Sequence, residues 1–261
     1  MERSNYKHLK ASALCFLMVL FAWIAPLGST VQASSGYAAF QNLIYRAYTE
    51  GRMSLWESTL ASMEFEYSRN PKPELLYDIL LAQYGLIGYH LGIDDNRTGR
   101  ALLDKASENL KILEQAGRYE AEAKLFRAAF NAFRISLRPW LGVRLGPQSQ
   151  RLISDAIEIK PEYPRAWIEN GNLMYHAPAM FGGSKTKAIE HYSIAIELME
   201  QDLQNNHRWL YLGTLVSLAN AYEYTGQHQK AIAALEKALA YEPGFAWVRD
   251  ELLPELKMKS Q

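Results

Sequence analysis

Residues 215–243 read LVSLANAYEYTGQHQKAIAALEKALAYEP, and the spacing of their apolar side chains decides the fold. One helical face carries apolar residues at three- and four-residue intervals, namely Leu215, Leu218, Ala219 and Tyr222. Gly226 ends this helix, and a second amphipathic run follows it, with Ala231, Leu235 and Ala238 on its inner face. Pro243 closes the second run, because proline cannot continue a helix. The stretch therefore predicts two helices joined by a short turn.

This pattern resembles the tetratricopeptide repeat, a helix–turn–helix unit of the form W-x2-L-G-x2-Y…A-x3-F…P. At the first position and the F-type position, Leu215 and Leu235 stand as other apolar groups, and Ala219 keeps a small residue at the Gly position. The resemblance implies an all-α fold, a right-handed α-solenoid of antiparallel helical hairpins. In such arrays small residues lie where the two helices of a hairpin approach closely.

A second signature of the repeat precedes the first along the chain. Its first helix carries Trp167, Asn170 and Gly171, and its second carries Ala188, Tyr192 and Ala195. Asn170 stands where the family has an apolar residue. The distance from Gly171 to Ala188 is five residues longer than the distance from Ala219 to Ala231, which indicates an extended turn inside this hairpin.

Helical periodicity extends the array toward the N-terminus, so we expect one repeat domain over residues 34–261. Residues 119–243 carry the resemblance to the family, whereas residues 37–117 show the periodicity of hairpins only. A last helix, at about 245–257, is expected to cover the exposed core face of the final repeat. The five hairpins are expected at 37–70, 74–117, 119–161, 164–206 and 208–243.

Residues 1–33 have the pattern of a secretory signal peptide. Arg3, Lys7 and Lys10 precede an apolar stretch from about residue 11 to residue 24, and Val31-Gln32-Ala33 places small residues where a signal peptidase reads. We therefore expect cleavage after Ala33 and export to the periplasm. The alternative is that this segment stays uncleaved as a membrane anchor.

The mature chain that this cleavage would leave has no cysteine, 25 basic residues and 27 acidic residues. A fold without disulfides must be held by its core. The near balance of charge gives no electrostatic reason to expect nucleic acid or anionic lipid as a partner.

Residues 182–186, Gly-Gly-Ser-Lys-Thr, resemble a phosphate-binding loop only superficially. The phosphate loop requires a lysine directly after its last glycine, and here Ser184 intervenes. We interpret the stretch as a turn in which Gly182 and Gly183 permit positive φ and Ser184 caps the next helix.

No motif for a reaction or a metal site accompanies this pattern. The histidines after residue 33 show no helical i, i+4 pair, and Asp94 and Asp95 lack the glycine and the distal glutamate of a calcium loop. We therefore expect no catalytic residues, no metal and no cofactor.

The resemblance implies that the first helices of the repeats line a concave groove that holds a peptide or a protein. Asn172 and Asn220 each follow the small residue of their repeat, where some family members bind the backbone or the terminal carboxylate of a peptide. Alternatively, both side chains are hydrated or bond a neighbouring helix. The groove residues expected from the resemblance are Ile168, Asn172, Tyr175, Val216, Asn220 and Glu223.

Three turns, at 92–97, 139–147 and 178–183, are longer than the repeat requires, and all three join a first helix to a second helix. Such insertions emerge along one edge of an array and often mark a binding face. Their apolar residues either pack together into a rim or contact a partner. These residues are Ile93, Trp140, Leu141 and Phe181, of which we single out Trp140 and Phe181 for a partner.

These observations lead to a functional hypothesis. We expect a non-enzymatic, exported scaffold that binds a protein or a peptide through its concave groove. The alternative is a periplasmic carrier of a small ligand, similar to the tetratricopeptide-repeat components associated with tripartite transporters.

Overall fold

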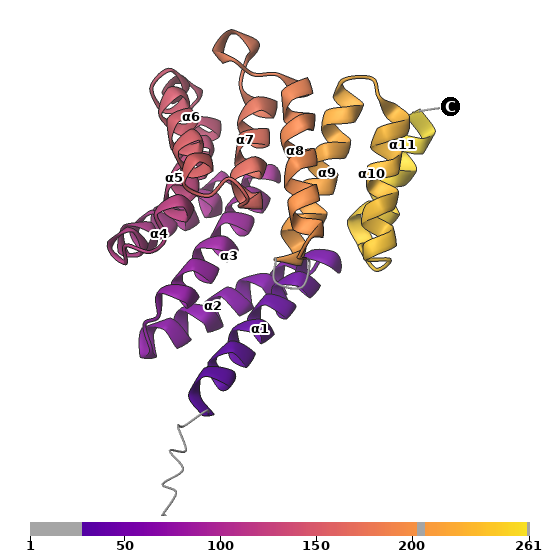
Figure 1. The fold of residues 1–261 in the computed structure, drawn as a ribbon. Helices are drawn as coiled ribbons and strands as arrows, with labels where there is room; N and C mark the ends of the chain where they lie inside the picture. Colours follow the sequence, from indigo (N-terminus) through magenta and orange to yellow (C-terminus); the bar gives the residue numbers. More distant parts are fainter. Residues whose placement is uncertain (1–27, 203–206, 260–261) are drawn as a thin grey trace, which may run out of the picture.

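The computed structural model describes residues 28–202 and 207–259, and every regular element within these ranges is helical (Figure 1). The helices are α1 Gly28–Thr49, α2 Met53–Arg69, α3 Pro73–Gly92, α4 Asn96–Gln115, α5 Glu120–Leu137, α6 Gly142–Ile159, α7 Pro164–His176, α8 Lys185–Glu200, α9 Arg208–Tyr224, α10 His228–Tyr241 and α11 Leu253–Lys259.

Helices α1 to α10 form antiparallel pairs that stack into an array, α1 with α2, α3 with α4, and so on to α9 with α10. The second helix of each pair also packs on the first helix of the next, as it does between α8 and α9. The all-α solenoid expected from the sequence is therefore confirmed.

The C-terminal end is covered by a helical segment, as predicted. Residues 248–252 form one π-helical stretch, which leads directly into α11, and both pack on α10. Pro254 has no N–H to donate to the preceding turn, which explains a change of hydrogen-bonding pattern at this point. Val248, the first residue of this segment, and Phe245 just before it are fully buried.

Two of the three turns expected to be long are short, and that prediction is wrong. The turn between α3 and α4 comprises only residues 93–95, because Asp95 accepts the amide N–H of Thr98 and caps α4. The turn between α5 and α6 ends at Leu141, so that Gly146 and Pro147 lie inside α6. Pro147 lies near the start of that helix, where it deprives a single carbonyl of its donor.

Helix α1 of the first hairpin packs against α9 of the last hairpin, so the two ends of the array are in contact (Figure 1). Tyr48 of α1 contacts Trp209 of α9 and Phe245, with ring centroids 6.0 Å and 5.1 Å apart. Trp56 of α2 meets Trp209 edge to face at 5.0 Å. The two indoles lie on Gly85 of α3, where a Cβ would come within 2.5 Å of Trp56. Aromatic packing thus joins α1 and α2 to elements near the other end of the chain.

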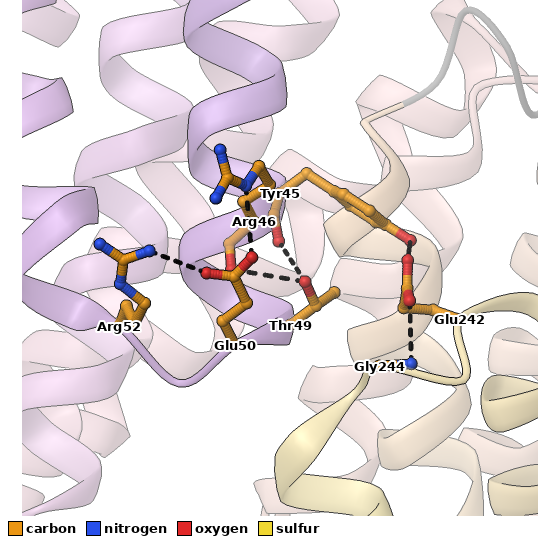
Figure 2. Close-up of polar contacts among 7 residues, drawn as sticks. All are labelled: Tyr45, Arg46, Thr49, Glu50, Arg52, Glu242 and Gly244. Atoms are coloured by element: carbon orange, nitrogen blue, oxygen red, sulfur yellow. Dashed lines mark hydrogen bonds and ion pairs between the residues drawn. The ribbon is translucent and has the colours of Figure 1, made fainter.

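A polar contact reinforces this closure (Figure 2). The hydroxyl of Tyr45 donates to Glu242 Oε2 at 2.7 Å, and the N–H of Gly244 donates to Glu242 Oε1 at 2.9 Å. On the side of α1, the carboxylate of Glu50 is held between Arg46 and Arg52. Glu242 therefore connects the end of α1 to the loop that follows α10.

One large core runs through the closed array, from Ile44 in α1 to Leu256 in α11. A smaller satellite core lies between α5, α6 and α7. None of the helices in the described ranges is both long enough and apolar enough to cross a bilayer. Of the expected signal peptide, residues 1–27 lie outside the described residues.

Candidate functional site

The expected groove on the concave face is largely filled. Ile168 and Val216 are only 5% and 4% exposed, and both belong to the main core. The prediction that these two side chains point outward into an open groove is therefore wrong. The physical reason is the closure of the array: α1 packs against α9, and residues of α1 and α3 share one core with Ile168 and Val216.

Asn172 serves as a connector between helices. Its side-chain oxygen accepts from the hydroxyl of Tyr192 at 2.8 Å, and its amide donates to Tyr84 Oη and to Glu169 Oε2, each at 3.4 Å. These bonds join α3, α7 and α8. The alternative drawn from the sequence, a bond to a neighbouring helix, thus describes the side chain of Asn172.

The other three expected groove residues remain at least partly accessible. Asn220 is exposed on α9, one helical turn before Tyr224. Tyr175 is half-buried, and its ring lies 6.4 Å from that of Tyr224. Glu223 is bonded to His228 Nδ1 at 2.6 Å. The accessible part of the first-helix face therefore lies at the C-terminal end of α7 and α9.

The glycine-containing stretch between α7 and α8 is a turn with a helix cap, as interpreted from the sequence. Gly182 has a φ of +89°, as expected. The expected positive φ of Gly183 is wrong, because that glycine is needed for space instead: a Cβ there would collide with the carbonyl oxygen of Ala177. Ser184 Oγ accepts the N–H of Lys187 at 3.3 Å.

Lys185, which a phosphate-binding loop would direct at its ligand, is engaged within the protein. Its ammonium donates to the carbonyl oxygen of Tyr175. The same ammonium lies over the rings of Tyr175 and Tyr224, at 4.5 Å and 4.9 Å from their centroids. The lysine therefore fastens the turn to the ends of α7 and α9.

The turns that follow α5, α7 and α9 gather at the top of Figure 1. Five large apolar side chains there are between 52% and 82% exposed, whereas Leu141 is buried. Ile93 is also exposed, on the turn after α3. We call the surface over the three upper turns the turn edge, and it is defined by Trp140, Val143, Met180, Phe181 and Tyr224.

The turn edge holds five of the twelve large apolar side chains that the described residues expose. Clusters of exposed apolar side chains commonly mark interaction sites. The sequence singled out Trp140 and Phe181 but missed the remaining three residues. Val143 and Met180 lie within two of the stretches expected to be turns, and Tyr224 lies just before Gly226, which was expected to end the first helix of its repeat.

Cations flank these apolar side chains. Arg138, Arg144 and Lys187 are exposed on or beside the same turns, and within the described part of the chain no ion pair involves any of the three. Elsewhere among the described residues many cations are paired, as Lys124 is with Asp155 and Lys237 with Glu200. The turn edge therefore combines apolar area with positive charge that no described carboxylate neutralises.

Within residues 28–202 and 207–259, no group of three histidine, aspartate, glutamate or cysteine side chains is arranged to hold a metal ion. His90 lies between Asp95, at 3.1 Å from Nδ1, and Glu57, at 3.3 Å from Nε2. Desolvation lowers the pKa of His176, which lies at the C-terminal end of α7.

Comparison with known proteins gives a consistent picture of the fold. The family model of the tetratricopeptide repeat matches residues 214–245. The HusA haemophore from Porphyromonas gingivalis has a similar fold, with a TM-score of 0.59 and 17% identity over 74% of this chain and 96% of that one. A thermophilic tetratricopeptide-repeat protein of Thermus thermophilus aligns with a TM-score of 0.51 and 20% identity, over 84% of this chain and 96% of the other. No curated protein matches the sequence.

At these identities the likeness extends to the fold and not to any ligand. The fold itself is one that commonly serves as a scaffold for protein–protein interaction. The matched repeat at residues 214–245 is the stretch whose spacing predicted the architecture. Residues 214–245 thus match a tetratricopeptide repeat, and the chain as a whole has the fold of solved tetratricopeptide-repeat structures.

Proposed function

We propose that this protein is an exported, non-enzymatic scaffold that binds a partner protein through the turn edge. The observation that carries the proposal is the concentration of exposed apolar side chains on three adjacent turns, beside Arg138, Arg144 and Lys187. Aromatic and methionine side chains are enriched where proteins bind one another. The partner that fits this surface presents apolar pockets and a net negative charge around them.

The position of the turn edge also explains how a closed array can bind. Extended peptides need an open concave face, and Ile168 and Val216 are buried in it. The turns project from the ends of the helices, so their side chains remain accessible after closure. Asn220 and Tyr175 adjoin Tyr224 and extend the surface along α7 and α9. A partner that covers the turn edge would therefore reach the accessible part of the expected groove.

The test is capture of a partner from the envelope fraction of the source organism, with quantitative mass spectrometry. Trp140→Ser combined with Phe181→Ser removes two exposed side chains at little cost to the fold. The matched control, Phe65→Ser combined with Ile112→Ser, removes two exposed apolar side chains from α2 and α4. We expect one defined protein to be retained by the wild type and by the control, and its retention to fall at least tenfold with the turn-edge variant.

Two results would overturn this assignment. The first is equal retention of the partner by the wild type and the turn-edge variant. The second is binding to vesicles of anionic phospholipid that depends on Trp140 and Phe181, with no protein retained. The turn edge would then be a membrane-binding surface.

Export is tested separately. Expression of the full chain followed by fractionation and N-terminal sequencing should find a periplasmic protein that begins at Ser34. A cytoplasmic protein that begins at Met1 would contradict export, and a membrane-bound chain that retains residues 1–33 would identify an uncleaved anchor.

A further inference from the structure

A solvent-open cavity of about 380 Å³ lies away from the turn edge, between α1, α3 and the residue before α5. Its volume falls within the range of sites that hold small molecules, roughly 300–1,000 Å³. The side chains that matter for recognition are three tyrosines, one amide and two carboxylates: Tyr37, Tyr77, Tyr119, Gln41, Glu74 and Asp78.

Aromatic rings form one wall of this cavity. The rings of Tyr77 and Tyr119 are stacked, with centroids 5.7 Å apart and planes inclined by 11°. The hydroxyl of Tyr77 is bonded to that of Tyr163 at 2.7 Å, and the ring packs on Phe126 at 5.8 Å. Tyr77 is thus held from two sides, so this wall is preformed.

The two carboxylates of the cavity differ in their partners. Glu74 forms an ion pair with Arg118, whose guanidinium lies over the ring of Tyr119 at 5.2 Å. Asp78 is only 9% exposed, and no lysine or arginine of the described residues pairs with it. Its Oδ2 accepts from Gln41 Nε2 at 3.1 Å, and its Oδ1 lies 3.5 Å from His207 Nε2. Within the described ranges, this buried carboxylate therefore has no lysine or arginine to balance it.

The histidine beside Asp78 does not supply that cation at neutral pH. Burial lowers the pKa of His207 to about 4, and the positive charge of Arg165 acts in the same direction. Burial raises the pKa of Asp78 to about 6. Above that pH the carboxylate is ionised and His207 is neutral. A buried charge is costly unless it is paired, so an added cation would be favoured here.

We propose that this cavity binds a small organic ammonium ion, whose nitrogen lies against Asp78 and whose carbon body is covered by the tyrosine rings. A single positive charge fits, because Arg118 already neutralises Glu74. An apolar or aromatic body fits the stacked wall of Tyr77 and Tyr119. This site is separate from the turn edge, so the proposal holds or fails independently of the proposed function.

Isothermal titration with two molecules of nearly equal shape tests the charge requirement. 2-Phenylethylamine carries an ammonium group, and 2-phenylethanol carries a neutral hydroxyl in its place. We expect the amine to bind and the alcohol to bind at least tenfold more weakly. Equal affinity for the two probes, or no binding of the amine at 10 mM (about the weakest affinity that such a titration resolves), would overturn the proposal.

Variants locate the site. Asp78→Asn keeps the shape of the side chain and should weaken amine binding at least tenfold, with the fold checked by circular dichroism. Asp155→Asn is the matched control, because it removes an exposed carboxylate that pairs with Lys124 outside the cavity, and it should leave the affinity unchanged. An Asp78→Asn protein that is folded and binds the amine normally would contradict the proposal.

The pH dependence gives a second readout. Amine binding should strengthen between pH 5 and pH 7.5, as Asp78 loses its proton. The other groups that face this carboxylate are Glu74 and Tyr77 on its own helix, Tyr37 on α1, Tyr119 before α5 and His207 before α9. Since the tyrosines stay neutral over this range and Glu74 is paired, a flat profile would exclude Asp78 as the anionic group. The Trp140→Ser/Phe181→Ser variant should bind the amine as the wild type does.

Discussion

At the scale of single residues, the packing of the helices depends on close contacts that leave no room for a larger side chain. Gly171 on α7 faces the ring of Tyr192, and a Cβ at that position would lie 2.5 Å from the ring. Tyr192 is 1% exposed and its hydroxyl is bonded to Asn172, so the ring cannot move aside. The resemblance to the repeat pattern predicted a small residue here. The structure identifies the group that requires it.

Gly171→Ala should therefore lower the free energy of unfolding by about 1–3 kcal/mol, the usual cost of overpacking a core. Gly146→Ala is the control, because Gly146 lies in α6 with open space around its Cα. Alanine there should stabilise the protein by about 0.5–1 kcal/mol. Urea denaturation of both variants measures the difference, and a destabilised Gly146→Ala beside a neutral Gly171→Ala would contradict the packing.

Asp78 and His207 should affect stability with opposite pH slopes. The pKa of Asp78 is raised from 3.8 to about 6, so the folded state holds its proton more tightly and stability falls as pH rises between these values. The pKa of His207 is lowered from 6.5 to about 4, so stability rises with pH over nearly the same range. In the wild type the two contributions nearly cancel.

Each single variant should expose the slope of the other residue. Between pH 4 and pH 6.5, the free energy of unfolding of Asp78→Asn should rise with pH relative to the wild type, because only the contribution of His207 remains. That of His207→Gln should fall with pH, because only the contribution of Asp78 remains. Each change is at most about 3 kcal/mol, from the cited shifts and about 1.36 kcal/mol per pH unit. Urea midpoints measured across this range provide the test, and parallel slopes in the two variants would refute it.

At the scale of elements, the sequence predicted helices better than turns. Ser184 caps α8 as expected, because a serine followed by an amphipathic run is a local signal. The start of α6 was misplaced, because Gly146 and Pro147 suggest a loop when read without the packing that holds them in a helix. Asp95 caps α4 by accepting the amide N–H of Thr98. The sequence shows this Asp-x-x-Thr spacing, but residues 92–97 were expected to form an extended turn.

A buried ion pair on α7 links three elements. Arg165 and Glu169 are 2% and 4% exposed, and Arg165 Nη2 lies 3.5 Å from Glu169 Oε1. The guanidinium of Arg165 stacks on Phe126 of α5 at 3.7 Å and faces Tyr84 of α3 at 5.2 Å. Neither role was visible in the sequence, because both residues read as ordinary members of an amphipathic helix.

Glu169→Ala should destabilise the protein by about 3–5 kcal/mol, since it leaves a buried guanidinium without its counter-charge. Replacement of both residues, Arg165→Met with Glu169→Leu, should restore much of that loss, because the pair is exchanged for apolar groups of similar size. Thermal and urea unfolding of the single and the double variant measure the two stabilities. A double variant that is less stable than Glu169→Ala would show that the pair itself stabilises the fold.

At the scale of the whole molecule, closure is the feature that the sequence did not predict. Repeat patterns describe contacts between neighbouring hairpins, whereas Tyr48, Trp209 and Phe245 meet across most of the chain. The prediction of an open groove is wrong for this reason, since Ile168 and Val216 are buried in a core that also contains residues of α1. The residues of the turn edge remain exposed in the closed array, because they lie at or beyond the helix ends.

The Tyr45–Glu242 bond should contribute measurably to closure (Figure 2). Tyr45→Phe and Glu242→Gln should each cost about 1–3 kcal/mol, as expected for a hydrogen bond to a charged group. In a double-mutant cycle the two losses should overlap, with a coupling energy of about 0.5–3 kcal/mol. Fully additive losses would mean that the two side chains do not interact in solution.

The most direct test of closure is a distance between α1 and α9 in solution. Asn42 Oδ1 accepts from Arg208 Nη2 at 2.8 Å, so both positions lie at the contact. Cysteines at these two positions, in a chain whose sole cysteine is replaced by Cys15→Ser, can carry spin labels for pulsed electron paramagnetic resonance. A closed array predicts one narrow distribution at contact range. A broad distribution at long range would show an open solenoid with an accessible concave face, and would contradict the account.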